Sequence, residues 1–510
     1  MERIEKNIEQ LRAEIERKAS QAPIYSTGLK AMLYQFLENL EIDKAKKMFS
    51  CHQDDAYKAI SEFLPEKHAI NDRPNKKRQD LEDYPTCKLT CAIQRRTNSV
   101  STHFMFGNKL KFTLGNDPKE AKMLRPYFDI FLDYLDKHYF NERMYEARQI
   151  TGAETECAKL YSLYKGEDGK VEVICQLKSN SRGDTLYSLF NQYGKMVAFA
   201  VGYNLRDSEF RAEEHFDVYT SDVIWKFRKG NVANQNGWEE IEKTVNVFGK
   251  IPVIYYHHEV DWDGAQPNID RLEWITSKNG DTNEYFGNPY LVISPDIADE
   301  RLADAREVGK VMVTDAEGRF EFVAPPDCGD MIINEKNDLN ASIERDTLTP
   351  DWTYKSISGL GTLSSKAMRQ INISGYVKRN RLAIKVYNEL IRREINLIIA
   401  ILCNYEYLGN SDVCEGLQAM KVNFAYQDPF VGGLDDNSTE IATFVGASAM
   451  SIHSAVMANP YIEDKEAEEE RIWQEIERKA MIEAKIATAS AAANSKKESS
   501  EVTKEDEKGG

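Results

Sequence analysis

Residues 359–366, GLGTLSSK, combine two glycines, three hydroxyl side chains and a lysine ahead of a segment with helical periodicity. A glycine-rich loop before a helix can direct backbone N–H groups at an anion, and many nucleotide sites hold phosphates in this way. Such a loop needs a Gly-Lys pair followed by Ser or Thr, after a strand. Here Gly361 is followed by Thr-Leu-Ser-Ser-Lys, and Pro350 precedes the loop. We therefore interpret the loop as mechanical and not as a nucleotide site.

Other residue patterns that could support catalysis are equally incomplete. The sequence has no G-x-S-x-G and no H-E-x-x-H motif. His257 and His258 adjoin, but neighbouring residues on a strand point to opposite faces. Residues 261–264, DWDG, resemble the beginning of a calcium loop but lack its third aspartate and distal glutamate, so they predict a turn. We expect no catalytic residues, no metal and no cofactor, and hence no enzyme.

Composition limits the class of protein further. The chain has 510 residues, is 42% hydrophobic and carries a net charge of −17. The length allows several domains, and the acidic balance disfavours tight wrapping of nucleic acid, which depends on Lys and Arg. An acidic surface is still compatible with DNA that slides past it. Of the eight cysteines only Cys87 and Cys91 lie close together, which predicts reduced thiols and no disulfide framework. No apolar run is long enough to span a membrane.

The chain alternates between helical and strand-forming patterns, which predicts an α+β fold. Helical periodicity is expected at 1–18, 27–49, 54–64, 88–106 and 118–150. Alternating apolar residues dominate from about 155 to 256, beginning with a hairpin whose turn lies at 167–169. Residues 268–286 and 330–348 are again helical and enclose a small β patch at 290–328. We expect this patch at the tip of two antiparallel helices.

A long helix is predicted from Ser364 to Tyr405, with a Ser364–Ser365 N-cap. It would span about 42 residues, or roughly 60 Å. Gly375 in its interior predicts either a bend or a point of close packing. The first half is basic and has no acidic residue before Glu389, whereas the second half is apolar. Two or three more helices are expected within 438–487, followed by a disordered tail from 491 to 510 that is poor in apolar residues.

The order of these elements resembles the portal (head-to-tail connector) proteins of tailed bacteriophages, of the siphophage-like type. IPVIYYHH (251–258) is similar to the family's Ile-Pro-Val strand that closes the wing, and NIDRLEWITSKNGDTNEYF (268–286) to the stem helix that follows. TLTPDW (347–352) before GLGTLSSKAMRQI resembles a Thr-Pro loop that leads into a Ser-rich helix start. The segment 438–475 resembles the family's Glu-rich final helices. The resemblance covers residues 85–480, and we find no counterpart for residues 51–85.

The resemblance implies a portal fold with a mixed α/β wing, a two-helix stem, a small β-containing clip, a long kinked tunnel helix and an α-helical crown. Its expected domains are N-terminal helices and wing 1–265, stem helix 266–287, clip 288–330, stem helix 331–350, tunnel loop 351–363, long tunnel helix and wing 364–437, helical crown 438–490 and tail 491–510.

The same resemblance implies a dodecameric ring at one capsid vertex, assembled in the host cytoplasm. The ring would form the channel for packaging and ejection of double-stranded DNA, bound without regard to sequence. Its partners would be the terminase large subunit, the major capsid or scaffold protein, and head-completion or adaptor proteins. The alternatives are another virion structural protein, such as a minor head or adaptor component, or a nucleic-acid hydrolase.

Two groups of residues are predicted to act in such a ring. The expected DNA-tunnel residues are Lys355, Gly359, Gly361, Ser364, Lys366 and Arg369. The expected residues of the tunnel helix or the subunit interface are Lys378, Arg379, Arg381 and Lys385. For this second group two interpretations remain open: contact with DNA, or pairing with acidic residues of the next subunit.

Overall fold

The computed structural model describes residues 25–78, 81–166, 169–206, 212–230, 237–287, 291–293, 311–313, 329–350, 370–429, 441–459 and 465–505. The chain divides into two compact units. The first comprises Met1–Thr353 and Asn372–Pro429, and the second Tyr354–Ile371 and Phe430–Gly510. The predicted helix at 1–18 lies outside the described residues. Helices and mainly antiparallel sheets both contribute, as expected for an α+β fold.

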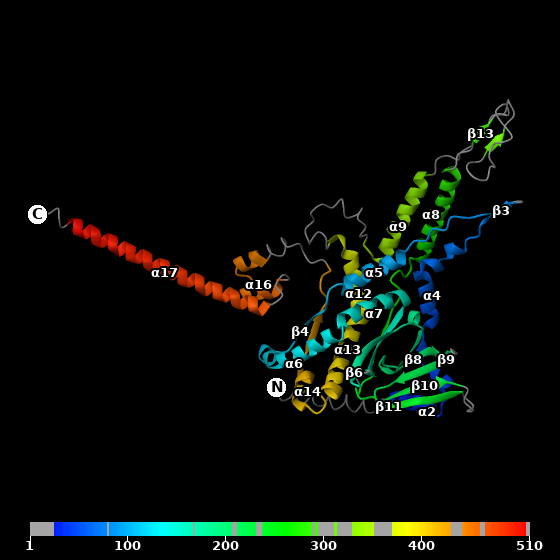
Figure 1. Cartoon of the computed structure of the whole chain (residues 1–510), viewed down its shortest axis with the longest axis horizontal. Coiled ribbons are helices and arrows are strands. Elements are labelled where there is room, and N and C mark those ends of the chain that lie inside the picture. Colours follow the sequence, from blue (N-terminus) through cyan, green and yellow to red (C-terminus); the bar gives the residue numbers. More distant parts are fainter. Residues whose placement is uncertain are drawn as a thin grey trace, which may run out of the picture. The chain divides into compact units, whose positions relative to one another are not determined.

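A six-stranded antiparallel sheet forms one end of the first unit (Figure 1). Its strands, in spatial order, are β1 (Ser50–Cys51), β7 (Asp184–Phe190), β8 (Met196–Arg206), β9 (Ala212–Tyr219), β10 (Val223–Lys229) and β11 (Trp238–Val245). The helices α2 (Tyr25–Glu38) and α3 (Ile42–Lys46) supply apolar side chains to the core of this sheet. Leu33 and Leu37 of α2 pack there with the fully buried Trp225 and Trp238. The alternation of apolar residues therefore does mark a β-rich module.

A second, three-stranded sheet lies between this module and the helices. It has the order β12 (Val253–His257), β5 (Glu156–Lys165) and β6 (Val171–Lys178). The β5–β6 pairing confirms the hairpin predicted from the sequence, although residues 167–168 of its turn lie outside the described part. The Ile-Pro-Val phrase contributes Val253 and Ile254 to β12, and both side chains are fully buried.

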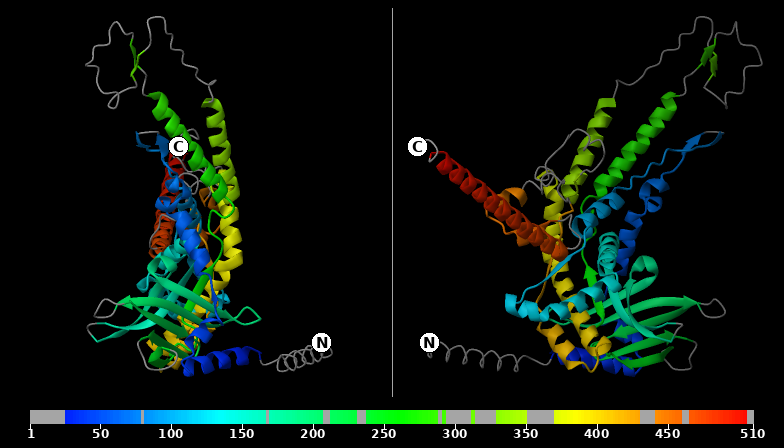
Figure 2. Two further views of the ribbon diagram at one scale, coloured as in Figure 1. Left: turned by 90° about the vertical axis from the view of Figure 1, so that its right-hand side faces the viewer. Right: turned by 60° about the vertical axis from the view of Figure 1, so that its left-hand side comes forward.

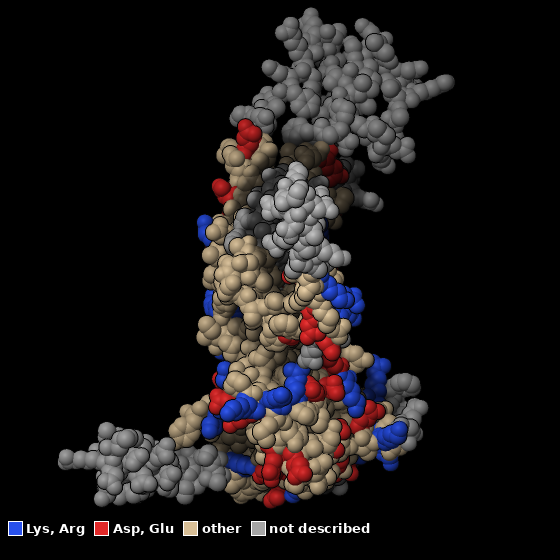
Figure 3. Space-filling model, turned by 90° about the vertical axis from the view of Figure 1, so that its left-hand side faces the viewer, with Lys and Arg blue, Asp and Glu red and all other residues tan. Residues whose placement is uncertain are grey.

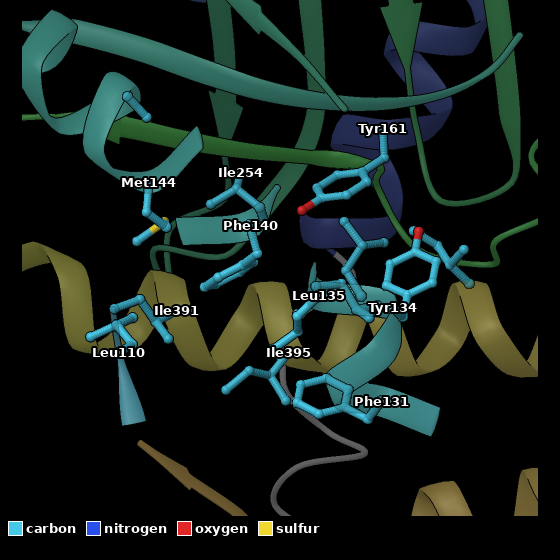
Figure 4. Close-up of a cluster of buried hydrophobic side chains, with 14 of the residues drawn as sticks. Leu110, Phe131, Tyr134, Leu135, Phe140, Met144, Tyr161, Ile254, Ile391 and Ile395 are labelled. Carbon is cyan, nitrogen blue, oxygen red and sulfur yellow. The ribbon is translucent and has the colours of Figure 1, made fainter. Parts of the chain in front are cut away.

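Four helices also belong to this unit: α4 (Gln53–Phe63), α5 (Ile93–Phe106), α6 (Pro118–Lys137) and α7 (Phe140–Glu154). Of these, α7 packs against β5 and β12 of the three-stranded sheet, and α4, α5 and α6 pack against α7. The sequence predicted a single helical segment over 118–150, but α6 and α7 are separate because Tyr139 adopts a left-handed backbone with φ 53°. The interruption lets Phe131 of α6 and Phe140 of α7 enter one apolar core (Figure 4). The C-terminal end of the helix expected at 88–106 is confirmed, because α5 ends at Phe106 and Gly107 follows it.

Two helices then run side by side away from the sheets (Figure 2). They are α8 (Gln266–Gly287) and α9 (Gly329–Thr347), and Leu272 packs in one cluster with Ile343 at their base. Between them in sequence lie two short strands, β13 (Leu291–Ile293) and β14 (Val311–Val313), which pair in parallel. The expected helix, β patch, helix order is therefore present.

The segment between α4 and α5 lies along α8. It contains two 3₁₀ turns, η1 (Pro65–Lys67) and η2 (Ala69–Asp72), and the paired strands β2 (Lys76–Arg78) and β3 (Leu81–Tyr84). Glu273, Ser277 and Asp281 stand one helical turn apart on α8 and accept the backbone N–H groups of Cys91, Leu89 and Cys87 at 2.7–2.8 Å. Two residues of extended chain advance about as far as four residues of helix, so the contacts stay in register. Arg73, earlier in the same segment, also forms a buried ion pair with Asp281, so this part of the chain is held against α8.

The long helix of the first unit is built from α12 (Ile373–Leu382), a π-helical turn (Ala383–Tyr387), α13 (Asn388–Ile401) and a second π-helical turn (Leu402–Glu406). The short helix α14 (Ser411–Ala419) follows, and then β15 (Val422–Ala425), which pairs with β4 (Lys111–Leu114). The described helix agrees with the prediction at its C-terminal end. The predicted start at Ser364 lies outside the described residues.

The second unit contains α16 (Ile452–Ala458) and α17 (Lys465–Glu505). Composition predicted disorder from residue 491, but α17 continues to Glu505. The helical pattern persists because the sequence from Lys465 to Glu505 contains no Gly or Pro and is rich in Ala, Glu and Lys, which favour helix. No helix among the described residues of either unit is long and apolar enough to cross a membrane.

Candidate functional site

The candidate site lies where the long helix meets the base of α8 and α9. Gly375 of α12 faces the ring of Phe104, and a Cβ atom at this position would lie 2.5 Å from ring carbons. The close-packing alternative for Gly375 is therefore confirmed, because a larger side chain would separate α12 from α5. One turn further along, Lys378 is only 4% exposed and points into the same junction.

A buried carboxylate stands at the centre of this junction. Asp261 lies in the turn that follows β12, as the sequence predicted for DWDG. Arg148 of α7 donates two hydrogen bonds to it, from Nη1 to Oδ2 at 3.0 Å and from Nη2 to Oδ1 at 2.7 Å. Lys378 approaches from α12, with Nζ 2.8 Å from the carbonyl oxygen of Asp261 and 3.5 Å from Oδ1. One carboxylate thus joins the turn before α8, α7 and the long helix.

The Arg148–Asp261 ion pair is tightly packed on the side of α5 and α7. Ser101 of α5 accepts a hydrogen bond from Arg148 Nη2 at 2.7 Å and donates one to Asp261 Oδ1 at 3.2 Å. A Cβ atom at Gly152 would come within 2.3 Å of both Arg148 Nη1 and Asp261 Oδ2. Only glycine fits there, because any side chain would displace one of the two charged groups.

The charges of the junction shift its ionisation. Burial alone would raise the pKa of Asp261, but Arg148 and Lys378 outweigh it and hold that pKa below its usual value. Burial lowers the pKa of Lys378, and Asp261 opposes this change only in part. His258 is fully enclosed, and burial together with Arg148 lowers its pKa to about 4. Near neutral pH the imidazole is therefore uncharged.

The hydrogen bonds of His258 are consistent with this neutral form. Its Nδ1 lies 2.6 Å from the carbonyl oxygen of Glu259, an acceptor, so Nδ1 carries the proton. Its Nε2 lies 3.2 Å from the hydroxyl of Tyr387, which therefore donates to it. Tyr387 belongs to the first π-helical turn of the long helix, so the histidine links that turn to the end of β12.

A second buried ionic contact lies further along the same helix. Lys159 of β5 and Glu394 of α13 are both fully buried, with Nζ 2.9 Å from Oε1. Tyr161 and Tyr256 also donate hydrogen bonds to the Glu394 carboxylate, at 2.5 and 3.2 Å. This contact fixes α13 against the three-stranded sheet and continues the apolar core shown in Figure 4.

Two hollows border the junction. The smaller, of about 240 Å³, is lined by the end of α9 and by Lys378 and Arg381 of α12. The larger, of about 730 Å³, lies between α4, the turn before α8, and Lys385. Among the residues that the structure describes, no three His, Cys, Asp or Glu side chains are placed to hold a metal ion. The charged groups at the junction are engaged in ion pairs, as in a structural connection between elements.

The basic residues predicted on this helix have different environments. Lys378 pairs with Asp261, and Lys385 donates to both carboxylate oxygens of Glu259 at 2.6 and 2.8 Å. Arg379 stacks over Tyr376 at 5.0 Å, and Arg381 is exposed. Lys378 and Lys385 therefore have carboxylate partners within their own chain. The predicted tunnel residues Lys355, Gly359, Gly361, Ser364, Lys366 and Arg369 lie outside the described residues.

Sequence reasoning did not identify Arg148 or Glu394 as important. Both sit in helices with many other charged residues, so their burial leaves no local signal. Asp261 was noticed only as part of a turn. The signals that pointed to this junction were Gly375, which interrupts a strongly helical segment, and Lys378, which was expected at a subunit interface or in the tunnel helix.

Comparison with known families gives one match. A family model described as "Phage portal protein, SPP1 Gp6-like" matches residues 42–481. No curated protein matches the chain. The matched range includes both sheets, the helices α8 and α9 and the whole long helix, and it also includes residues 51–85, for which the sequence alone offered no counterpart. The chain belongs to the phage portal protein family.

Proposed function

We propose that this chain is the subunit of a portal ring that conducts double-stranded DNA through one vertex of a phage capsid. The family match over residues 42–481 carries the proposal. In this proposal the two sheets and surrounding helices form the wing, α8 and α9 the stem, and residues 288–330 the clip. Residues 351–363 would be the tunnel loop and residues 438–490 the crown.

The distribution of charge supports a ring through which DNA moves and not a protein that binds DNA tightly. The net charge is −17, and on the face in Figure 3 the Lys and Arg side chains lie among Asp and Glu and form no continuous basic surface. A continuous basic surface would hold DNA through release of counterions, whereas a mixed or acidic one leaves a duplex mobile. Cations of the proposed tunnel, such as Lys355 and Lys366, would make transient contacts with phosphates, which carry no sequence information.

The buried junction supports a mechanical role for the long helix. Asp261 ties α12 to the turn before α8, and Glu394 ties α13 to β5. In this proposal, force applied to the stem is transmitted to the wing through these buried, hydrogen-bonded side chains. In this proposal the packaging ATPase belongs to a terminase partner, and the portal ring provides its docking platform and later that of head-completion proteins.

Imaging of the purified chain in negative stain tests the proposal. We expect ring-shaped particles with a central hole and twelve subunits. A chain that is folded, as judged by circular dichroism, and that stays monomeric at high concentration would contradict it.

Replacing Lys355 with Ala should reduce DNA retention modestly and leave the rings intact, and loss of the rings would assign that lysine a structural role instead.

A further inference from the structure

The first half of the long helix exposes several aliphatic side chains. Lys378 is buried and paired with Asp261, whereas Lys385 is exposed and paired with Glu259 at the surface. Ile373, Val377 and Ile384 are instead 62%, 50% and 78% exposed. Their spacings of four and seven residues place them on one face of the helix. We call these three residues the aliphatic stripe.

Such a stripe needs a partner. Scattered exposed apolar residues are ordinary, but a row of large aliphatic side chains along one helix face marks an interaction site. Arg381, beside the stripe, is also exposed and forms no ion pair among the described residues. The partner surface should therefore be apolar and carry acidic groups.

The larger hollow of the chain has these properties. Its apolar lining includes Ala59, Val260, Trp262 and Pro267. Asp55, Asp263 and Asp270 add three carboxylates, and none of these forms an ion pair with Lys or Arg within the described residues. Lys58 and Lys385 also line the hollow, and Lys385 is paired with Glu259. At about 730 Å³ the hollow has room for more than one aliphatic side chain.

We propose that the aliphatic stripe of one copy docks into this hollow of a second copy, with Arg381 facing Asp55. The inference rests on the proposed ring, and it names the surfaces that meet. Because the stripe and the hollow are different surfaces, the contact is heterologous, and repeating it around an axis closes a ring without leaving either surface free. Opposite charges beside an apolar centre favour this pairing over a stripe-to-stripe contact, which would bring the Arg381 side chains together.

Crosslinking tests the pairing directly. A chain that carries both Val377→Cys and Lys58→Cys, assembled and treated with a short bismaleimide, should give a ladder of covalent multimers on a denaturing gel. Each single variant and the parent chain control for the native cysteines, of which Cys51 is exposed. A mixture of the two single variants should give dimers but no ladder, because each chain then carries only one of the two cysteines and can be linked to only one neighbour.

Substitutions test whether the contact contributes to assembly. Ile384→Ser should lower the fraction of chains in rings about tenfold at limiting concentration, which corresponds to about 1.4 kcal/mol of lost contact free energy. Leu408→Ser is the matched control, because Leu408 is also 78% exposed but lies off the stripe, and it should not change assembly. Arg381→Glu and Asp55→Lys should each weaken assembly, and the two together should restore it.

The possible results separate this inference from the proposed function. Rings that form normally but give no ladder would overturn the pairing and leave the portal function standing. A crosslink confined to single chains would mean that the stripe packs within its own chain, which also overturns the inference. A parent chain that forms no rings would contradict the proposed function itself.

Discussion

The two buried ionic contacts along the long helix differ in their balance of charge. At the first, Arg148 and Lys378 share the single carboxylate of Asp261. At the second, Lys159 faces Glu394 alone, and two tyrosine hydroxyls complete the hydrogen bonding. The first therefore buries an excess of positive charge, whereas the second is neutral. A neutral pair can be replaced by apolar groups, but an unbalanced cluster depends on its one carboxylate.

The largest effect is expected from Asp261→Asn. The change leaves two buried cations without a counter-charge, which should cost about 3–5 kcal/mol of folding stability. Thermal unfolding of the first unit checks this, and we expect a lower midpoint and reduced yield of folded chain. Asp263→Asn is the control, because Asp263 is exposed in the same turn and forms no ion pair among the described residues. Equal behaviour of the two variants would refute the central role of Asp261.

A double substitution sharpens the comparison. Glu394→Gln alone should cost about 3 kcal/mol, because it leaves Lys159 charged and buried. Lys159→Met combined with Glu394→Leu should recover part of that loss, since no charge stays buried, although the hydroxyls of Tyr161 and Tyr256 lose their acceptor. The corresponding pair at the first contact, Lys378→Met with Asp261→Leu, should not recover, because Arg148 stays unpaired. Recovery of folding stability at both sites would contradict the excess of positive charge assigned to the contact around Asp261.

His258, next to this unbalanced contact, predicts that folding stability depends on pH. His258 has a pKa of about 4 in the folded chain, below its ordinary value of 6.5. Between these values the unfolded chain binds more protons, so stability is lost as the pH falls from about 6.5 to 4. The loss can reach on the order of 3 kcal/mol. Thermal midpoints of the parent chain and of His258→Gln across this range isolate the effect, and parallel curves would contradict it.

The smallest of these effects concerns packing at the start of the helix. Gly375→Ala should cost about 1–3 kcal/mol, because the new methyl group meets the ring of Phe104. Gly28→Ala is the matched control in α2, where nothing lies within 4 Å of the added atom, and it should gain up to about 1 kcal/mol. A neutral Gly375→Ala variant would show that α12 and α5 can separate without cost.

Local patterns in the sequence predicted most of the secondary structure. The alternation of apolar residues after residue 155 marks the β-rich module, and the helix–strand–helix order of 268–348 matches α8, β13, β14 and α9. The break at Tyr139 was missed because a left-handed tyrosine has no local signature. The helix through Glu505 was missed because a low apolar content was interpreted as disorder, although alanine and charged residues favour helix without a core.

The junction could not be predicted from the sequence, because its residues lie far apart along the chain. Arg148, Asp261 and Lys378 are more than 100 residues apart in sequence, and each is unremarkable among its neighbours. The sequence left open whether the basic residues of the long helix contact DNA or find acidic partners in the next subunit. It could not indicate that Lys378 and Lys385 find theirs in the same chain, because that depends on how the turn after β12 packs against α12.

The central claim is that this chain assembles as a portal ring, and the mass of the assembled particle tests it most directly. Native mass spectrometry of the purified full-length chain should give a closed species of twelve subunits, with single-particle images that have matching rotational symmetry. A folded chain whose mass never exceeds that of a dimer, measured at the protein concentration used for crosslinking, would contradict the proposed portal ring.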